Sequence, residues 1–211
     1  MPITLCNDQI TRHTEAHMHY DGGPILAIDA ATRCGFAFGE PGKTPLLESI
    51  ALRRPTDPRT VAFGNASRII YKFINSPTPP VLVVIEGTVP LIKIKGKRKT
   101  DAGASVLKGL YAIFAGAAEA HGIPVQSANI QKWRKHSLGA GNLTTEEAKR
   151  RSMQMCERFG WQAADDNAAD AAGIWLWACS QVGEQHRPLS TFSKMDIAEY
   201  RAIALVRGRA G

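Results

Sequence analysis

The pattern of hydrophobic and polar positions along this chain contains two short apolar runs, and each run is followed by a single carboxylate. Residues 25–28 (ILAI) are followed by Asp29, and residues 81–85 (VLVVI) are followed by Glu86. Runs of this length without polar alternation are typical of strands that are buried on both faces. The first run is followed by a second apolar stretch at residues 35–39, which predicts a β-hairpin with Asp29 near the end of its first strand.

The rest of the pattern mixes strands and helices. The other expected elements are a strand over 46–53, a helix from a cap at Thr56 or Asp57 to residue 73, a helix over 104–121, a strand over 123–128, a short helix over 129–136, a helix capped by Thr144 or Thr145, and a helix within 164–178. A strand, helix and strand of this spacing imply a right-handed parallel crossover, so the predicted fold class is α/β with a mixed sheet. If the two carboxylate-ending strands pair, Asp29 and Glu86 meet at one sheet end, since neighbouring strands lie about 4.8 Å apart.

Composition and charge point to a polyanionic partner. The chain has 211 residues, with 26 Lys and Arg against 19 Asp and Glu, a net charge of +7. This balance favours nucleic acid over a membrane surface as the partner. We expect one globular domain over residues 24–180, an N-terminal extension over 1–23 and a basic C-terminal tail over 181–211.

The cysteines and the hydropathy of the chain exclude several classes of protein. Four scattered cysteines lack the spacing of a zinc site or a disulfide framework, which favours a reducing cytoplasm. No stretch approaches the roughly 20 apolar residues of a membrane span, and no signal-peptide pattern opens the chain. We therefore expect a soluble protein of the reducing cytoplasm.

A third acidic site lies in the last helix. Asp166 and Asp170 are four residues apart and share a helix face, where two like charges need an offsetting partner. Together with Asp29 and Glu86 they make four carboxylates at the ends of buried elements, with no histidine or cysteine beside them. Such oxygen ligands select Mg²⁺ or Mn²⁺ over zinc. Two such ions about 3.5–4 Å apart can activate water and stabilise the leaving oxygen in phosphodiester hydrolysis.

Two basic stretches are candidates for gripping phosphate. Residues 91–100 directly follow the strand that ends at Glu86, and residues 129–142 combine a basic helix with a glycine-containing turn before a capped helix. A solvated surface and a simple turn between helices are the alternative interpretations of these stretches. The expected DNA-backbone contacts are Lys93, Lys95, Lys97, Arg98, Lys99, Lys132, Arg134, Lys135 and Asn142.

Taken in order, these residues resemble a known family. The chain contains, in order, Asp29 with Thr32 and Gly35, Glu86 at the end of VLVVIEG, residues 132–141, and residues 166–171 (DNAADA). In these motifs it is similar to the RuvC-like Holliday junction resolvases of the RNase H-like superfamily, in their phage-type variant. The resemblance runs over residues 25–178 and implies a mixed five-stranded sheet flanked by helices. It further implies a homodimer with residues 104–118 near its seam, which nicks four-way DNA junctions symmetrically in recombination and repair. Asp29, Glu86, Asp166 and Asp170 would then be catalytic and hold two Mg²⁺ ions, with Mn²⁺ able to substitute.

The chain departs from the family pattern at two places. Bacterial RuvC proteins often space their last two acidic residues by three, which would place Asn167 in the site. Phage-type relatives resemble the DDNxAD arrangement of this chain, so we prefer Asp166. Family members can also carry an aromatic wedge after the glutamate strand, where this chain has Val89, Pro90 and Leu91. The resemblance therefore gives no account of how a junction centre would be opened.

Three other functions fit parts of the sequence. The same four carboxylates could hydrolyse flap DNA or RNA:DNA hybrids, because they act on any phosphodiester that reaches them. A noncatalytic junction-binding protein is also possible, although the complete acidic set argues against it. An actin-like ATP-binding domain, suggested by residues 29–35, would need a second duplicated domain, and 211 residues leave no room for one.

Overall fold

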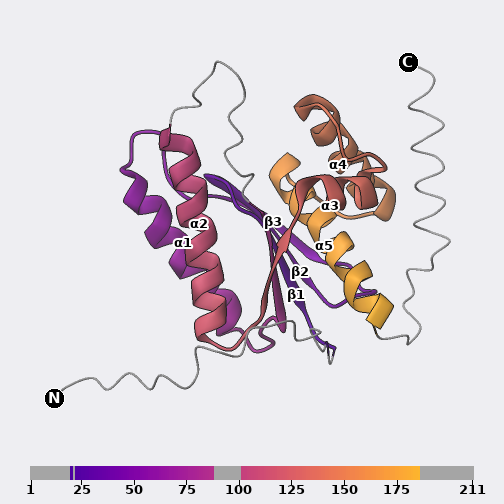
Figure 1. Cartoon of the computed structure of the whole chain (residues 1–211), viewed down its shortest axis with the longest axis horizontal. Coiled ribbons are helices and arrows are strands. Elements are labelled where there is room, and N and C mark those ends of the chain that lie inside the picture. The colour runs from indigo at the N-terminus through magenta and orange to yellow at the C-terminus, as the bar shows by residue number, and fades with distance from the viewer. Residues whose placement is uncertain (1–19, 21, 88–100, 186–211) are drawn as a thin grey trace.

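One mixed β-sheet organises the part of the chain that the structure describes. The structure is a computed structural model, and it describes residues 20, 22–87 and 101–185. Five strands lie in the order β3-β2-β1-β4-β5 (Figure 1). They are β1 (Ile25–Asp29), β2 (Arg33–Gly39), β3 (Leu46–Ala51), β4 (Leu82–Glu86) and β5 (Val125–Ala128). β2 is antiparallel to β1 and β3, whereas β4 is parallel to both β1 and β5. The predicted hairpin, parallel crossover and α/β class are confirmed.

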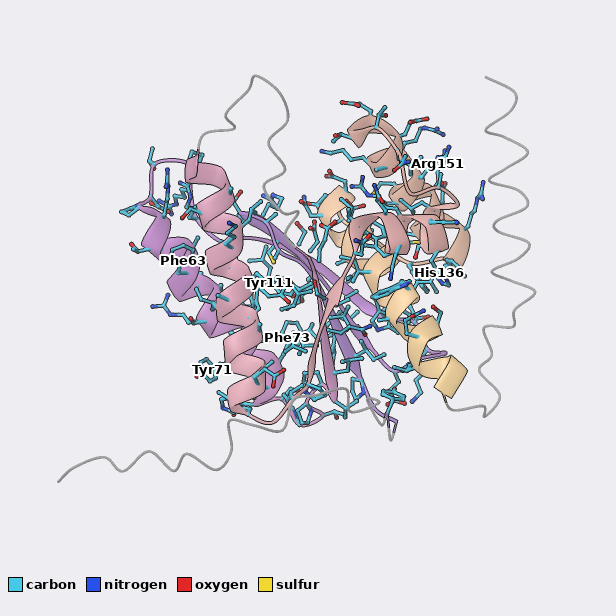
Figure 2. All side chains as sticks on the ribbon, in the orientation of Figure 1. Phe63, Tyr71, Phe73, Tyr111, His136 and Arg151 are labelled. Atoms are coloured by element: carbon cyan, nitrogen blue, oxygen red, sulfur yellow. The ribbon has the colours of Figure 1, made fainter. Side chains whose placement is uncertain are left out.

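Helices cover both faces of this sheet. α1 (Arg59–Ile74) and α2 (Asp101–Ala120) pack on one face, and Figure 1 shows α3 (Ile130–Leu138), α4 (Thr145–Phe159) and α5 (Asp166–Gln185) on the other. Phe63, Phe73 and Tyr111 lie on the α1 and α2 side, and His136 and Arg151 lie on the opposite side (Figure 2). Each face of the sheet therefore has its own buried core.

The alternation of side chains along β1 and β4 decides which core each residue joins. Leu26 and Ile28 belong to the core under α1 and α2, whereas Ala27 belongs to the core under α5. Because the side-chain period of a strand is two, Asp29 follows Ala27 onto the α5 face. The parallel register pairs Ala27 with Val84, so the same alternation carries Glu86 onto that face beside Asp29.

The N-caps of α1 and α4 differ in how far they agree with the sequence prediction. The cap expected at Thr56 or Asp57 was wrong: Pro58 is the N-cap of α1, and no side chain caps this helix. Asp57 instead accepts a hydrogen bond of 2.8 Å from the backbone N–H of Arg54, which closes a turn before the helix. Thr144 does cap α4, and its side chain and that of Glu147 form a reciprocal capping box.

Some expectations fall outside the described residues. The residues that are not described are 1–19, 21, 88–100 and 186–211. Val89, Pro90, Leu91 and the predicted basic segment fall within residues 88–100. The expected division at residues 23 and 180 stays a prediction, and α5 continues to Gln185.

Cys34, Cys156 and Cys179 are free thiols. In the ranges that are described, no helix has both the length and the apolar character needed to cross a membrane.

Candidate active site

Two carboxylates meet at the carboxyl ends of β1 and β4. Asp29 is the last residue of β1 and Glu86 the last residue of β4, and their side chains share a hydrogen bond. The pKa of Asp29 is raised well above its ordinary value, chiefly because burial removes water from the carboxylate. Repulsion from the charges of Glu86, Asp170 and Asp166 raises it further. This end of the sheet therefore disfavours an isolated negative charge and favours a bound proton or cation.

Asp170 reaches the same place from α5. Burial and the charge of Glu86 raise its pKa from 3.8 to about 6, while the Ser152 hydroxyl and the Arg134 guanidinium act in the opposite direction. Ser152, fully buried on α4, donates its hydroxyl to Oδ1 of Asp170. Two helices thus contribute polar groups to the charge balance of this one carboxylate.

Asp166 lies at the exposed edge of the group. Its Oδ2 is 2.6 Å from Nζ of Lys149, with side chains that are 30% and 54% exposed. This ion pair supplies the offset that two like charges on one helix face require. Lys149 was not singled out by the sequence analysis, because nothing in the spacing of α4 indicates that it faces Asp166.

The start of α5 is held close to β2 by a residue without a side chain. Gly35 is paired with Asp29 across the hairpin. A Cβ atom on Gly35 would lie 1.9 Å from the carbonyl oxygen of Asn167, so only glycine allows this approach. The backbone contact brings the first turn of α5 to the end of β1.

Asp165 fixes the same helix end and has a structural role. It accepts hydrogen bonds from the Ser49 hydroxyl (2.7 Å) and from the backbone N–H of Ala168 (3.1 Å), and it lies 3.6 Å from Arg33. Burial alone would raise the pKa of Asp165, but these partners outweigh burial and lower it. The side chain of Asn167 also hydrogen-bonds to Asp165 and helps to lower the pKa of that carboxyl.

Trp133 on α3 contacts Glu86. Its indole is fully buried, and Nε1–H donates to Oε1 of Glu86 at 3.3 Å. The guanidinium carbon of the adjacent Arg134 lies 5.5 Å from the centroid of the same indole. The sequence pattern predicts the short basic helix that carries Trp133, but nothing in that pattern connects Trp133 with Glu86.

Comparison with known proteins places this arrangement in a known fold. No family model matches the chain, and no curated protein matches its sequence. RuvC of Thermus thermophilus matches the structure with a TM-score of 0.55 and 19% identity, over 79% of this chain and 99% of that one. RuvC of T. thermophilus in complex with a Holliday junction substrate gives a TM-score of 0.58 and 18% identity over the same shares. The chain has the RuvC fold. The yeast mitochondrial Holliday junction resolvase Ydc2 gives a TM-score of 0.48 and 11% identity, over 86% of this chain and 83% of that one.

The predicted RuvC-like, RNase H-like fold is thereby confirmed, and the phage-type variant stays a prediction. The predicted DNA-backbone contacts differ in exposure, and some of them are not described by the structure. Lys132, Lys135 and Asn142 are exposed, and Asn142 accepts a hydrogen bond of 3.1 Å from Gln131. Arg134 is half-buried and acts on Asp170, so its charge faces the acidic site. Lys93, Lys95, Lys97, Arg98 and Lys99 lie outside the described residues.

The chemistry of the donor set fits a hard divalent cation in this RuvC fold. As they are placed, no three His, Cys, Asp or Glu side chains among residues 20, 22–87 and 101–185 form a ready metal cluster. Asp166 instead pairs with Lys149, and Asp29 shares a hydrogen bond with Glu86. All four carboxylates are nevertheless coupled through their charges, and all offer oxygen, the ligand that Mg²⁺ prefers. Their role as metal ligands stays a prediction.

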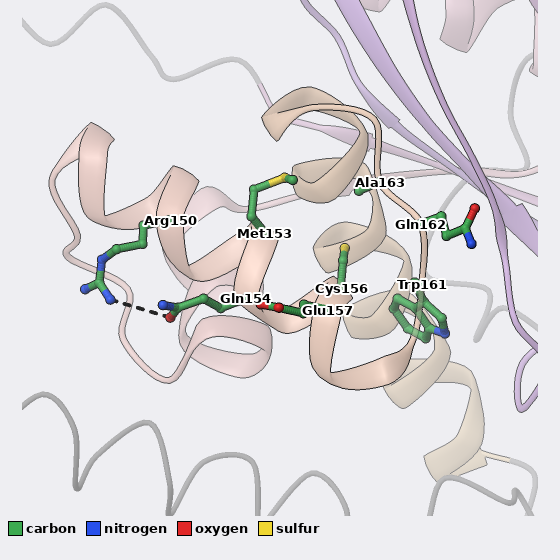
Figure 3. Close-up of a pocket in the computed structure, with 8 residues that line it drawn as sticks. All are labelled: Arg150, Met153, Gln154, Cys156, Glu157, Trp161, Gln162 and Ala163. Atoms are coloured by element: carbon green, nitrogen blue, oxygen red, sulfur yellow. Dashed lines mark hydrogen bonds between the residues drawn. The ribbon is translucent and has the colours of Figure 1, made fainter.

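A cavity of about 540 Å³ lies elsewhere and is lined by α4 and the segment that follows it (Figure 3). Arg150 donates to Gln154 at its edge, at 3.5 Å. None of the four carboxylates lines it, so it is separate from the candidate active site. Its lining residues are Arg150, Met153, Gln154, Cys156, Glu157, Trp161, Gln162 and Ala163.

Proposed function

We propose that this protein is a metal-dependent endonuclease that acts on branched DNA, with four-way junctions as its substrate. The observation that carries the proposal is the coupling of Asp29, Glu86 and Asp170 at one end of the sheet in a RuvC fold. A protein gains nothing in stability from carboxylates whose charges oppose one another. Perturbed acids of this kind are typical of functional sites.

In this proposal Asp29, Glu86, Asp166 and Asp170 hold two Mg²⁺ ions, and Mn²⁺ can substitute. Bound divalent ions supply a nucleophilic water at neutral pH and stabilise the leaving oxygen of a phosphodiester. Asp29 and Glu86 must release the hydrogen bond they share to present both carboxylates as ligands. Asp166 must turn from Lys149, which frees a lysine at the exposed edge of the site for a phosphate oxygen.

Positive charge around the acidic site supports a nucleic-acid substrate. Lys132 and Lys135 are exposed on α3, the helix whose Trp133 contacts Glu86, and the whole chain carries a net charge of +7. A solved RuvC of this fold is recorded with a Holliday junction substrate. A homodimer would present two such sites to a four-way junction and account for symmetric nicks.

Cleavage of defined DNA structures tests the proposal. A labelled four-way junction is compared with duplex, flap and RNA:DNA hybrid in Mg²⁺ or EDTA, for the wild type and Asp29→Asn. We expect paired nicks on the junction in Mg²⁺, lost in EDTA and lowered at least about 100-fold in D29N, because loss of a ligand should cost at least as much as the roughly 10–100-fold typical for loss of a residue that supports a ligand from outside the coordination sphere. Cleavage of flap or hybrid alone would replace the substrate and keep the chemistry. Tight junction binding without cleavage in Mg²⁺ or Mn²⁺ would overturn the catalytic proposal in favour of a binding protein.

A further inference from the structure

The indole of Trp133 restrains one of the candidate metal ligands. A glutamate side chain has several rotatable bonds, and ordering it costs conformational entropy. The Nε1–H of Trp133 donates to Oε1 of Glu86 at 3.3 Å, and the indole itself is fully buried. A buried indole N–H without an acceptor would lose free energy, so this hydrogen bond fixes both groups together. Oε1 is thereby held toward α3.

The position of Trp133 is in turn set by a close contact with α5. A Cβ atom on Gly173 would lie 2.8 Å from Cζ3 of Trp133 and 3.2 Å from its Cε3. One turn further along α3, Ser137 donates its hydroxyl to the carbonyl oxygen of Gly173 at 2.7 Å. Trp133 and Ser137 are both fully buried. The side chains of Trp133 and Ser137 on α3 therefore pack directly against the backbone of α5 at Gly173.

Gly173 connects this contact to another candidate ligand. It lies three residues after Asp170 on α5, so the two positions are neighbours on one face of the helix. Trp133 consequently fills the space between Glu86 on β4 and the turn of α5 that follows Asp170. The size of the indole separates these two elements, and its N–H orients the carboxylate of Glu86.

We propose that Trp133 is a positioning residue of the metal site, which sets the orientation of Glu86 and its separation from Asp170. This inference rests on the proposed function, because it presumes that Glu86 and Asp170 bind the metal. Hydrogen bonds to metal-ligating carboxylates from groups outside the coordination sphere commonly change metal affinity 10–100-fold, so about that range is expected here.

A matched pair of tryptophan substitutions tests the role of the N–H group. Trp133→Phe removes the donor to Glu86 and keeps an aromatic ring. Trp175→Phe is the control, since Trp175 is equally buried and donates at 3.2 Å to the carbonyl oxygen of Gly39, away from the carboxylates. Both variants should lose similar stability. We expect the dissociation constant for Mg²⁺, measured by calorimetry without DNA, to rise about tenfold or more in W133F and to stay near the wild-type value in W175F.

A second measurement needs no variant that might destabilise the fold. The chain has four tryptophans, and their indole N–H signals can be followed by ¹⁵N NMR during a Mg²⁺ titration of the wild type. The Trp133 signal should move with metal occupancy, and the Trp175 signal should move much less. A Trp133 signal that stays in place while Mg²⁺ binds would overturn the inference, as would equal Mg²⁺ affinity in W133F and the wild type. A wild type that binds no Mg²⁺ would overturn the proposed function as well.

Discussion

Gly35 and Asn167 are in backbone contact, because a Cβ atom on Gly35 would lie 1.9 Å from the Asn167 carbonyl oxygen. This contact joins β2 to the first turn of α5 and sets the distance of α5 from Asp29, the cross-strand partner of Gly35. The acidic site therefore depends on a glycine that carries no chemistry itself.

Gly35→Ala should displace the start of α5. We expect the free energy of unfolding to fall by about 1–3 kcal/mol, the usual cost of overpacking, together with a loss of Mg²⁺ affinity. Gly64→Ala is the control, because a Cβ atom there meets nothing within 4 Å on α1 and should raise stability by about 0.5–1 kcal/mol. Chemical denaturation and calorimetry give both quantities. Wild-type Mg²⁺ affinity in G35A would show that the contact does not position the site.

Asp170→Asn should stabilise the metal-free protein at neutral and alkaline pH. The folded-state pKa of Asp170 is raised from 3.8 to about 6, so its contribution to stability is fully present below about pH 4 and is lost as the pH rises through 6. Asparagine carries no charge and avoids that loss, so D170N should gain about 1–3 kcal/mol over the wild type at pH 8 in EDTA. Cleavage should be lost in the same variant. Denaturation curves from pH 4 to 8 measure the gain, and equal pH dependence in both proteins would contradict the assignment.

Much of the sheet, and the meeting of Asp29 and Glu86 at one of its ends, could be predicted from the sequence. The unbroken runs before Asp29 and Glu86 identified buried strands, and strand pairing alone then brings the two carboxylates together. The helical partners could not be found in this way. Trp133 packs against α5 at Gly173 and donates to Glu86, and Lys149 on α4 pairs with Asp166 on α5. These contacts depend on how the helices pack, which no periodicity in the sequence indicates.

The N-cap predicted for α1 was wrong because Asp57 is used in another local structure. Asp57 was a reasonable N-cap by residue type, yet its carboxylate is used by the backbone of Arg54 in a preceding turn. Two local structures competed for the same side chain, and the sequence does not say which one is formed. For α4 the sequence prediction left Thr144 and Thr145 open, and Thr144 is the cap because its side chain and that of Glu147 at the third helical position form a capping box.

Ser152→Ala should shift the pH dependence of cleavage. The Ser152 hydroxyl has one proton and two acceptors in reach, the Ala148 carbonyl oxygen at 3.0 Å and Oδ1 of Asp170. Its hydrogen bond lowers the pKa of Asp170, so removing the hydroxyl should raise that pKa. The acidic limb of the cleavage profile should then move to higher pH. Ser180→Ala, which removes a hydroxyl bonded to the Trp177 carbonyl oxygen, should leave the profile unchanged. An unmoved acidic limb in S152A would separate Ser152 from catalysis.

Asp166→Asn and Asn167→Ala together decide which residue completes the site. Asp166 is coupled by charge to Asp29 and Asp170, whereas the side chain of Asn167 bonds to Asp165. We expect D166N to lower cleavage at least about 100-fold at saturating junction DNA and N167A to lower it less than about tenfold. The reverse order would mean that the three-residue spacing of bacterial RuvC applies to this chain.

Replacing Lys97, Arg98 and Lys99 together by alanine should weaken DNA binding and leave the metal site intact. These residues are expected to neutralise phosphates, and the slope of log affinity against log salt should become shallower by about 0.9 for each phosphate that is no longer neutralised. Binding of a four-way junction is measured by fluorescence anisotropy between 50 and 200 mM salt, about the range over which such interactions weaken. Mg²⁺ affinity without DNA should equal that of the wild type. An unchanged salt slope would show that this segment does not bind DNA, and a parallel loss of Mg²⁺ affinity would show that the basic segment and the acidic site do not act independently.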